Sequence, residues 1–454
     1  MDNREQRQFL AKKNRISAGS FLLKNRRKKN LDRETYMVEN MIHNKALIFY
    51  GKKNNISKNE LLHTIIKDYK NYRHSWKIQP RNIINALDFK KTNVFKNSKP
   101  LCLDLEVASV CDLACPFCYR EHIVTPDKII DDKLCYELID QASKLKIPSI
   151  KFNWRGEPLL NPKLFDYIRY AKEKGILETI INTNATNLTE KNINKLIDVG
   201  LDLIIYSFDG GTKKTYEKMR PGRFKKNSFS NVYKNIQNFY KIRKERKAKF
   251  PFTKIQMILT EETFREIKNF YELFDDYVDE LTVNQYSERG GNLADLSEKE
   301  TKQYEKLLKK YNLSKGTPYM RDIFGKIKIS KTRKPCEQPF QRLFVTYEGK
   351  VAMCCYDWGA SYPVGFVNNK AFENRKDYDQ VLNNVKNKKK GFELLSKVKM
   401  PEVNNSPENK VKDLKNIWFG KEINIVRSKH SSNKSEEVSI CKNCTFKDVY
   451  DWSE

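Results

Sequence analysis

The chain has 454 residues, of which 39% are hydrophobic and 12% aromatic, and its 87 Lys and Arg outnumber its 57 Asp and Glu. This composition excludes a wholly disordered chain, because apolar and aromatic side chains repay the entropy lost on ordering, and the length favours two or three domains. The net charge of +30 suggests nucleic-acid binding, but the lysines are dispersed and no nucleic-acid-binding motif accompanies them, which favours solvated faces.

The apolar segments are short throughout. None approaches the length of about eighteen residues that a membrane helix needs, and the N-terminus lacks an apolar run typical of a signal peptide. We therefore expect a cytoplasmic protein that does not enter a membrane. The 10 cysteines would stay reduced there, so their spacing predicts metal ligation rather than disulfides.

Three regions follow one another along the chain. Residues 1–95 are basic, mostly helical in pattern and free of cysteine, and they predict a helical N-terminal extension. Residues 96–310 alternate short apolar strands with amphipathic helices, which is typical of a parallel sheet. Residues 311–454 combine strands, turns and clustered cysteines, and they predict a small separate C-terminal domain.

The middle region predicts an α/β fold, a partial (β/α)6 barrel similar to the TIM barrel. The expected strands are 101–108, 149–153, 178–183, 203–208, 254–259 and 280–285. The expected helices are 133–145, 162–174, 190–199, 231–246 and 262–274. Barrels of this kind gather their active sites at the C-terminal ends of the strands, so the residues after each strand are the candidates for function.

Three cysteines follow the first expected strand in a C-x3-C-x2-C run, at Cys111, Cys115 and Cys118. Three thiolates on one loop can hold three irons of a [4Fe–4S] cluster and leave the fourth iron open. The open iron could chelate the methionine part of S-adenosylmethionine (SAM). A structural zinc site is the alternative, but zinc prefers a closed tetrahedral set of ligands.

This run, followed by an aromatic residue after the first strand of a barrel, resembles the radical SAM superfamily. The resemblance implies that Cys111, Cys115 and Cys118 hold the SAM-binding cluster and that Tyr119 lies beside the adenine. After the second strand, residues 154–158 (WRGEP) resemble the family's Gly-Gly-Glu-Pro element, although an arginine replaces its first glycine. Gly156 and Glu157 would then grip the methionyl ammonium.

Two later turns extend the resemblance. Residues 182–184 (NTN) resemble the Thr-Asn-Gly turn, which places Asn184 near the ribose. Residues 207–210 (SFDG) resemble the Ser-x-Asp-Gly element, which places Ser207 and Asp209 near the ribose or the carboxylate. Arg220 either approaches the cofactor carboxylate or forms a surface salt bridge. Each turn is common chemistry by itself, and the order and position of the turns carry the resemblance.

A second cysteine set lies beyond the barrel. Cys336, Gly349 and Cys354 follow a C-x12-G-x4-C spacing, and Cys441 and Cys444 form a close pair near the end of the chain. The spacing resembles a shortened form of the auxiliary-cluster domain called SPASM. The resemblance implies one auxiliary [4Fe–4S] cluster on Cys336, Cys354, Cys441 and Cys444, with Cys355 as a neighbouring thiol. Zinc is the rival, since such a set fits tetrahedral coordination.

The resemblance implies an enzyme that reductively cleaves SAM to a 5′-deoxyadenosyl radical and abstracts hydrogen, so that a substrate is oxidised or modified. It also implies an electron donor such as flavodoxin or ferredoxin. A small-molecule or carbohydrate substrate is favoured over a peptide or protein. Residues 286–291, after the sixth strand, would line the same end of the barrel as the other turns and contact the substrate. No catalytic acid or base is assigned. The alternatives from other classes are a nucleic-acid-binding or RNA-modifying protein and a zinc-stabilised interaction module.

Overall fold

The computed structural model describes residues 32–53, 57–84, 93–260, 262–285, 319–321, 327–329, 336–393, 395, 398–401, 403, 405–442 and 444. The expected substrate segment 286–291 therefore lies outside the described residues. The helices are α3 (Arg33–Glu39), α4 (Leu47–Lys53), α5 (Lys58–Ile84), α6 (Asn93–Lys96), α7 (Asp132–Lys144), α8 (Leu164–Glu173), α9 (Glu190–Val199), α10 (Lys213–Met219), α11 (Phe229–Glu245), α12 (Ile267–Phe274), α14 (Lys370–Glu373), α15 (Lys376–Lys386), α16 (Leu414–Trp418), α17 (Lys421–Ser431) and α18 (Ser439–Lys442).

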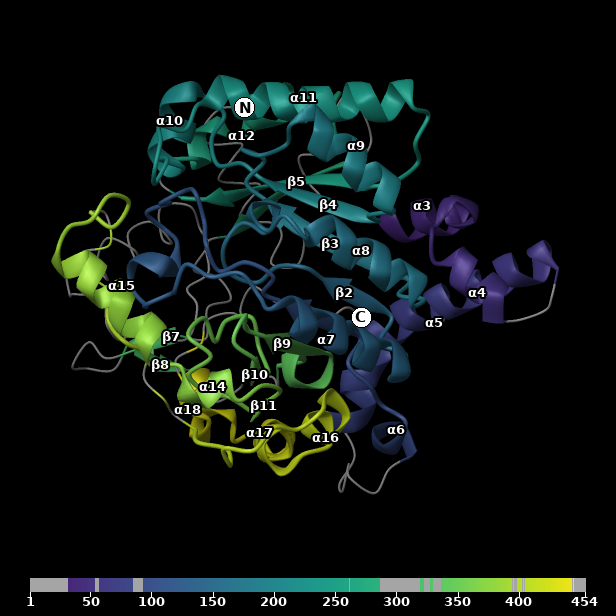
Figure 1. Ribbon diagram of the computed structural model, residues 1–454, viewed down its shortest axis with the longest axis vertical. Helices are drawn as coiled ribbons and strands as arrows, with labels where there is room; N and C mark the ends of the chain where they lie inside the picture. The colour runs from purple at the N-terminus through teal and green to yellow at the C-terminus, as the bar shows by residue number, and fades with distance from the viewer. Residues whose placement is uncertain are drawn as a thin grey trace.

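One large sheet organises the described residues (Figure 1). Its strands are β1 (Cys102–Leu105), β2 (Ser149–Lys151), β3 (Glu178–Thr183), β4 (Leu203–Ser207), β5 (Phe252–Leu259), β6 (Glu280–Gln285), β9 (Arg342–Val345), β10 (Lys350–Ala352) and β11 (Gly365–Phe366). The strand order is β11-β10-β9-β1-β2-β3-β4-β5-β6, and all neighbours from β9 to β6 are parallel. A separate antiparallel pair joins β7 (Tyr319–Arg321) and β8 (Ile327–Ile329).

The six parallel strands β1–β6 and their connecting helices confirm the predicted α/β fold. Local signals explain why these elements form where they do. Asp131 caps α7 by accepting a hydrogen bond from the Leu134 amide, and Thr189 caps α9 in the same way. Gly200 ends α9 with a left-handed φ of 81°, a conformation that glycine adopts without strain.

Some boundaries differ from the sequence prediction. The last expected helix, 262–274, begins as α12 only at Ile267, because a 3-10 turn at Phe264–Glu266 precedes it. The Thr263 hydroxyl donates to the Ile258 carbonyl and stabilises that turn. The first strand is also shorter than the expected 101–108. Its pairing with β2 ends at Asp104, and its pairing with β9 ends at Leu105.

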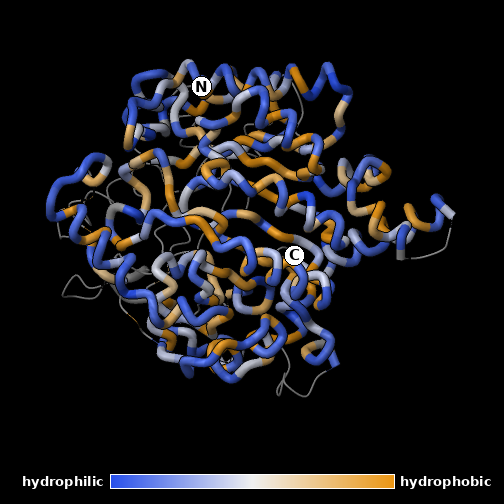
Figure 2. The backbone as a smooth tube through the Cα atoms, in the orientation of Figure 1, coloured by the Kyte–Doolittle hydropathy of each residue, from blue (hydrophilic) through white to orange (hydrophobic). Residues whose placement is uncertain are grey.

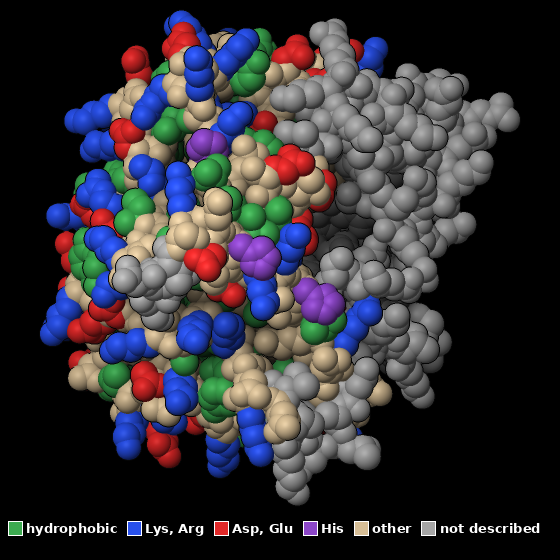
Figure 3. Space-filling model, turned by 90° about the vertical axis from the view of Figure 1, so that its right-hand side faces the viewer, with side chains coloured by type: hydrophobic (Ala, Val, Ile, Leu, Met, Phe, Trp, Pro, Cys, Tyr) green, Lys and Arg blue, Asp and Glu red, His purple; other side chains and the backbone are tan. Residues whose placement is uncertain are grey.

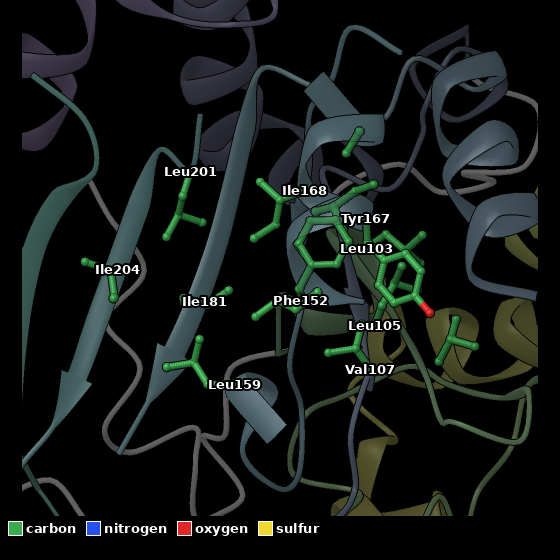
Figure 4. Close-up of a cluster of buried hydrophobic side chains, with 14 of the residues drawn as sticks. Leu103, Leu105, Val107, Phe152, Leu159, Tyr167, Ile168, Ile181, Leu201 and Ile204 are labelled. Atoms are coloured by element: carbon green, nitrogen blue, oxygen red, sulfur yellow. The ribbon is translucent and has the colours of Figure 1, made fainter. Parts of the chain in front are cut away.

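The main core lies between the outer face of the sheet and the helices that cover it. Figure 4 shows Leu103, Leu105 and Phe152 pointing toward the side chains of Tyr167 and Ile168, and all of these are buried. Each buried side chain of this kind contributes about 1.5–3 kcal/mol. Figure 2 shows the same division, with hydrophobic residues along the central strands and hydrophilic residues on the outer helix surfaces.

Helices α3–α5 of the N-terminal extension pack against the start of the strands. Tyr69 and Tyr72 belong to a buried cluster with Leu101 and Phe250. Leu101 immediately precedes β1, and Phe250 lies two residues before β5. The Tyr72 hydroxyl donates to the carboxylate of Glu178, the first residue of β3, at 3.0 Å. These helices therefore close the N-terminal end of the barrel.

The region after residue 336 continues the same sheet. Strand β9 pairs in parallel with β1, with Asp104 opposite Phe344, and β10 then turns back along β9. The sheet thus crosses the predicted domain boundary at residue 310, and the second cysteine set is anchored directly beside the first strand.

The surface agrees with the dispersed lysines of the sequence. In Figure 3, Lys and Arg side chains are spread over the described face and interspersed with Asp and Glu. No helix within the described ranges is long and apolar enough to cross a membrane.

Candidate functional site

Turns that follow four neighbouring strands converge at the C-terminal edge of the sheet. The cysteine loop follows β1, residues 154–158 follow β2, residues 184–186 follow β3, and residues 208–210 follow β4. Because these strands are parallel, their C-terminal ends meet at one edge. The site is built from the contacts between these turns.

The cysteine loop is held from both sides. The Cys118 amide donates to the Cys115 carbonyl at 2.9 Å, and backbone hydrogen bonds join Ala114 to Pro221 and Arg223 to Asp112. The described cysteines are free of disulfides. The loop therefore presents thiols on a fixed backbone.

Burial raises the pKa values of two of these thiols, those of Cys111 and Cys115. Burial raises the pKa of Cys111 to about 12, and the Asp112 carboxylate adds to the rise. Burial also raises the pKa of Cys115 well above its usual value; Arg220 opposes this, while Cys118 and Cys111 reinforce it. Cys115 is thus within electrostatic reach of both other sulfurs, and a positive centre bound here would favour the thiolate form of a cysteine.

Gly156 allows the turn after β2 to press against the cysteine loop. Its φ is +72°, and a Cβ atom there would lie 2.6 Å from the carbonyl oxygen of Val110 and closer still to that of Ala108. The next amide, that of Glu157, donates to the Val110 carbonyl at 2.8 Å. A side chain at position 156 would push this turn away from the start of the cysteine loop.

Glu157 points into the same junction and is almost fully buried. Its carboxylate accepts hydrogen bonds from the Thr183 hydroxyl at 2.8 Å and from the Asn184 amide at 2.7 Å. These bonds favour the charged form, but burial and then the charge of Asp112 outweigh them and raise the pKa of Glu157 to about 8. A cation bound beside this carboxyl would favour its ionised form, and the carboxylate would balance the charge of the cation.

Asn184 connects the third turn to the cysteine loop. Its side-chain amide donates to the Asp112 carboxylate at 2.7 Å and lies 3.9 Å from the Cys111 sulfur. The Thr186 hydroxyl donates to the other oxygen of Asp112 at 2.6 Å. Sequence reasoning missed Asp112, although a carboxylate between two cysteines is visible in the motif.

Asp209 and Arg220 form a buried ion pair. The Arg220 guanidinium lies 2.6 Å from the Asp209 carboxylate, whose other oxygen accepts from the Ile258 amide at 2.6 Å. Arg220 is only 7% exposed, so its salt bridge is not a surface one. Ser207 lies at the end of β4, where its hydroxyl accepts from the Gln256 side chain at 3.4 Å.

Arg155, the residue that departs from the family element, has a buried partner. Its guanidinium binds both carboxylate oxygens of Glu106, at 2.5 and 2.7 Å, and donates to the Trp358 carbonyl at 3.1 Å. Arg155 therefore ties the turn after β2 to the end of β1 and to the C-terminal region. Sequence reasoning missed Glu106, because an isolated glutamate after a strand carries no signal.

Tyr119 lies between the cysteine loop and the C-terminal region. It is buried, and its ring centroid lies 6.3 Å from that of Trp358. The predicted residues of the first site thus occupy one end of the sheet.

The second cysteine set gathers from distant parts of the chain. The Cys336 amide donates to the His430 ring at 3.2 Å, and the Cys444 amide donates to the Cys441 carbonyl at 3.3 Å. The pKa of Cys354 is raised well above its usual value, first by a hydrogen bond with the Cys355 thiol, then by burial and by the charges of Cys355, Cys336 and Cys444. Two of the predicted auxiliary cysteines, Cys336 and Cys444, therefore lie within electrostatic reach of a third, Cys354.

Cys355 and Cys441 have different surroundings. The Cys355 carbonyl accepts a hydrogen bond from the Trp154 indole at 3.1 Å, which places this residue near the turn after β2. Cys441 lies within α18 and packs against the main hydrophobic core. Within the described part of the chain, no group of three or more His, Cys, Asp or Glu side chains is arranged to hold a metal ion. The ligand sets therefore stay predictions.

Family models match two parts of the chain. The model of the radical SAM superfamily matches residues 105–274, and that of an iron–sulfur cluster-binding domain, SPASM, matches residues 336–445. The first match contains the cysteine loop and the three turns after β2, β3 and β4, and the second contains all four predicted auxiliary cysteines.

Individual relatives match shorter stretches. A tungsten-containing aldehyde ferredoxin oxidoreductase cofactor-modifying protein of Pyrococcus furiosus is 33% identical over 108 residues, 24% of this chain and 30% of that protein. An AdoMet-dependent heme synthase of Methanosarcina barkeri is 28% identical over 178 residues, 38% of this chain and 47% of that protein. The matches therefore span less than half the length of these relatives.

Solved structures resemble the chain at low identity. Streptococcus suis SuiB bound to its precursor peptide SuiA aligns with a TM-score of 0.46 and 16% identity, covering 87% of this chain and 78% of that chain. BtrN in complex with AdoMet and 2-DOIA aligns with a TM-score of 0.42 and 17% identity, covering 76% of this chain and 93% of that chain.

The two matched domains also define the cofactors. Both domain types imply [4Fe–4S] clusters, and the first implies SAM. The chain therefore contains a radical SAM domain over residues 105–274, followed by an iron–sulfur cluster-binding SPASM domain over residues 336–445.

Proposed function

We propose that this protein is an enzyme that abstracts hydrogen from a small polar substrate, which is thereby oxidised or otherwise modified. When bound, a [4Fe–4S] cluster with one open iron supplies the electron that cleaves SAM reductively to the 5′-deoxyadenosyl radical. The observation that carries the proposal is the convergence of the cysteine loop, Glu157 and Asn184 at one edge of the parallel sheet.

Cys111, Cys115 and Cys118 would hold this cluster. The donor chemistry fits, because the thiols sit on one fixed loop and an amide of Asn184 already points at the Cys111 sulfur. Thiolate sulfurs in iron–sulfur proteins are commonly stabilised by such hydrogen bonds. The fourth iron would have no protein ligand.

The surrounding turns would position SAM. Glu157 would bind the methionyl ammonium as a buried carboxylate, since a charge-assisted hydrogen bond to a cation favours its ionised form. Gly156 leaves room for close backbone approach at the same turn. Arg220, held by Asp209, would bind the carboxylate of the methionyl group.

The remaining predicted contacts belong to the nucleoside half of SAM. Asn184 and Ser207 would face the ribose, and Tyr119 would face the adenine. Asp209 is already bound to Arg220, so its proposed role is to orient that guanidinium or to accept from a ribose hydroxyl.

Cys336, Cys354, Cys441 and Cys444 would hold the auxiliary [4Fe–4S] cluster. A cluster with four protein ligands has no open iron, so its proposed role is to accept an electron from the substrate or to pass electrons to the first cluster. A flavodoxin or ferredoxin would be the external donor. This proposal is supported by the pairing of β9 with β1 and of β10 with β9, because β10 leads to Cys354.

The inner face of the sheet supports a small polar substrate. Its C-terminal end presents Asn182, Ser207 and Gln256 from three adjacent strands, and the deeper pair Lys254 and Glu280 is joined at 2.6 Å. These side chains suit hydroxyl and charged groups, as in a carbohydrate or a small acid. A peptide substrate is the alternative.

The direct test is formation of 5′-deoxyadenosine by anaerobically reconstituted, reduced protein supplied with SAM. Wild-type protein is expected to form it, and Cys115→Ala is expected to lose this activity. Cys135→Ala is the matched control, because Cys135 is buried in α7 among core side chains. Absence of 5′-deoxyadenosine from the wild-type reaction, or equal amounts from Cys115→Ala, would refute the proposal.

A further inference from the structure

Three charged side chains lie on the inner face of adjacent strands. Leu103 and Leu105 of β1 face the outer helices, so Asp104 faces the opposite side of the sheet. Lys151 of β2 is the register partner of Asp104, and Arg342 of β9 is the partner of Cys102, one layer deeper. The strand order β9-β1-β2 therefore brings the three side chains into the barrel interior.

Arg342 and Asp104 form the floor of this group. The Arg342 Nε atom lies 3.5 Å from an oxygen of Asp104, and the guanidinium stacks over the rings of Trp76 and Phe344, at 5.2 and 5.6 Å from their centroids. Asp104 is 1% exposed. One of its oxygens and the Arg342 Nε lack a hydrogen-bond partner among the described residues.

Among the described residues, Lys151 has neither a hydrogen-bond partner nor an ion-pair partner. Its side chain is partly exposed. Burial lowers the pKa of Lys151. The charges of Asp104, Cys355 and Cys102 oppose this in part, and the charge of Arg342 reinforces it. An ammonium group in such a place is unfavourable unless an anion joins it.

Other described charges on this face of the sheet have partners. Lys254 of β5 is paired with Glu280 of β6 at 2.6 Å, and Glu178 at the base is 3.8 Å from Arg33 and accepts from Tyr72. The group of Asp104, Lys151 and Arg342 holds two cations and one carboxylate. Within the described residues, this group therefore contains one more basic side chain than acidic ones.

This charge lies just below the proposed SAM turns. Lys151 ends β2, and three residues later Trp154 opens the turn that contains Gly156 and Glu157. The Trp154 ring stands 5.5 Å from that of Phe344, so an aromatic wall borders the group on the C-terminal side.

We propose that Lys151 and Arg342 form an anion subsite that binds a carboxylate or phosphate group of the substrate, which makes the substrate an anionic small molecule. The proposal rests on the proposed function, because it places that substrate beneath the SAM-binding turns. Asp104 orients Arg342 and limits the site to one net charge. Trp154 and Phe344 cover the part of the substrate next to the anion.

The probes are inorganic phosphate and acetate, titrated calorimetrically into the reconstituted, SAM-bound protein. The wild type is expected to bind at least one of them saturably at one site per chain, and the tighter probe identifies the group. Lys151→Met is expected to weaken that binding at least tenfold, whereas Lys151→Arg should stay within about threefold because it keeps the charge. Lys144→Met, on the exposed end of α7, is the control that should bind like the wild type.

Thermal unfolding of the same variants separates a binding role from a structural one. Because Lys151→Met removes an uncompensated charge, its melting temperature should equal or exceed that of the wild type. A clear loss of stability would instead show that Lys151 supports the fold.

Two outcomes would overturn the subsite: no saturable binding of either probe, or equal affinities for the wild type and Lys151→Met. The 5′-deoxyadenosine assay on the wild-type sample is a separate readout. If that assay is positive and binding does not depend on Lys151, only the subsite is wrong; if the assay is negative, the proposed function is wrong.

Discussion

Glu157 is the single residue on which the geometry of the proposed SAM site depends most. It accepts hydrogen bonds from the turn after β3, while its own backbone is joined to the residue before Cys111. Burial holds its pKa near 8, against an ordinary value of 4.5. The carboxyl is therefore mostly neutral at pH 7 until a cation binds.

The raised pKa predicts how stability depends on pH. The folded protein holds the Glu157 proton up to about pH 8, whereas the unfolded chain loses it near pH 4.5. The stabilising contribution is thus complete below pH 4.5 and is lost as pH rises through 8, with a slope of up to about 1.4 kcal/mol per pH unit. Urea unfolding of the apoprotein at several pH values should show this loss in the wild type but not in Glu157→Gln. Parallel curves for the two proteins would contradict the assignment.

Gly156 gives a prediction from geometry alone. Gly156→Ala is expected to lower the free energy of unfolding by about 2–4 kcal/mol, since the new Cβ meets the carbonyls of Ala108 and Val110 at a positive φ. Gly51→Ala is the matched control: a Cβ there would lie 3.5 Å from Leu61, and the helix α4 should gain up to about 1 kcal/mol. Equal stability of the two variants, measured by urea unfolding, would show that the turn can move.

At the scale of elements, the pair Arg155–Glu106 joins β1, the turn after β2 and the C-terminal region. Arg155→Met is expected to cost about 3–5 kcal/mol of unfolding free energy, because it leaves a buried carboxylate without its partner. The double variant with Glu106→Gln should recover part of that loss. Arg169→Met, which removes an exposed pair with Asp166, should change stability by less than about 1 kcal/mol. A small effect at Arg155 would argue against a structural link here.

The N-terminal helices are expected to unfold together with the barrel. Ile65→Ala in α5 should lower the free energy of unfolding by about 2–4 kcal/mol, since Ile65 is fully buried between this helix and the barrel base. Ile48, which is 57% exposed in α4, is the control, and its replacement by Ala should have little effect. A separate early transition in Ile65→Ala would instead mean that the extension is an independent unit.

Local patterns explain why much of the fold could be predicted from the sequence. The strands at 178–183 and 280–285 and the helix at 190–199 were placed at their observed bounds, because each is a short apolar or amphipathic run with clear punctuation. The pairing of β9 with β1 was not predicted. It depends on a contact between residues more than two hundred positions apart, for which a short strand such as Arg342–Val345 carries no signal.

The same limit applies to the site. The cysteine spacings and the three turns after β2, β3 and β4 can be predicted because each is a local motif. The partners that hold them, Glu106, Asp112 and the carbonyl of Trp358, are supplied by folding and have no motif of their own. The anion group of the barrel interior was invisible for the same reason.

At the scale of the whole molecule, one sheet connects the proposed SAM site to the second cysteine set. Strand β1 leads into the loop of Cys111, and β9 and β10, beside it, lead to Cys354. The Cys111 loop and Cys354 are therefore both attached to the same sheet. This arrangement suits electron transfer, which requires a constant distance between redox centres rather than a moving contact.

The most direct test of the central claim is electron paramagnetic resonance of reduced, reconstituted Cys441→Ala, in which only the barrel cluster should remain. We expect a [4Fe–4S] signal whose shape changes when SAM is added, because SAM becomes a ligand of the open iron. A signal that SAM leaves unchanged, or protein that takes up zinc and shows no iron–sulfur signal, would contradict the account.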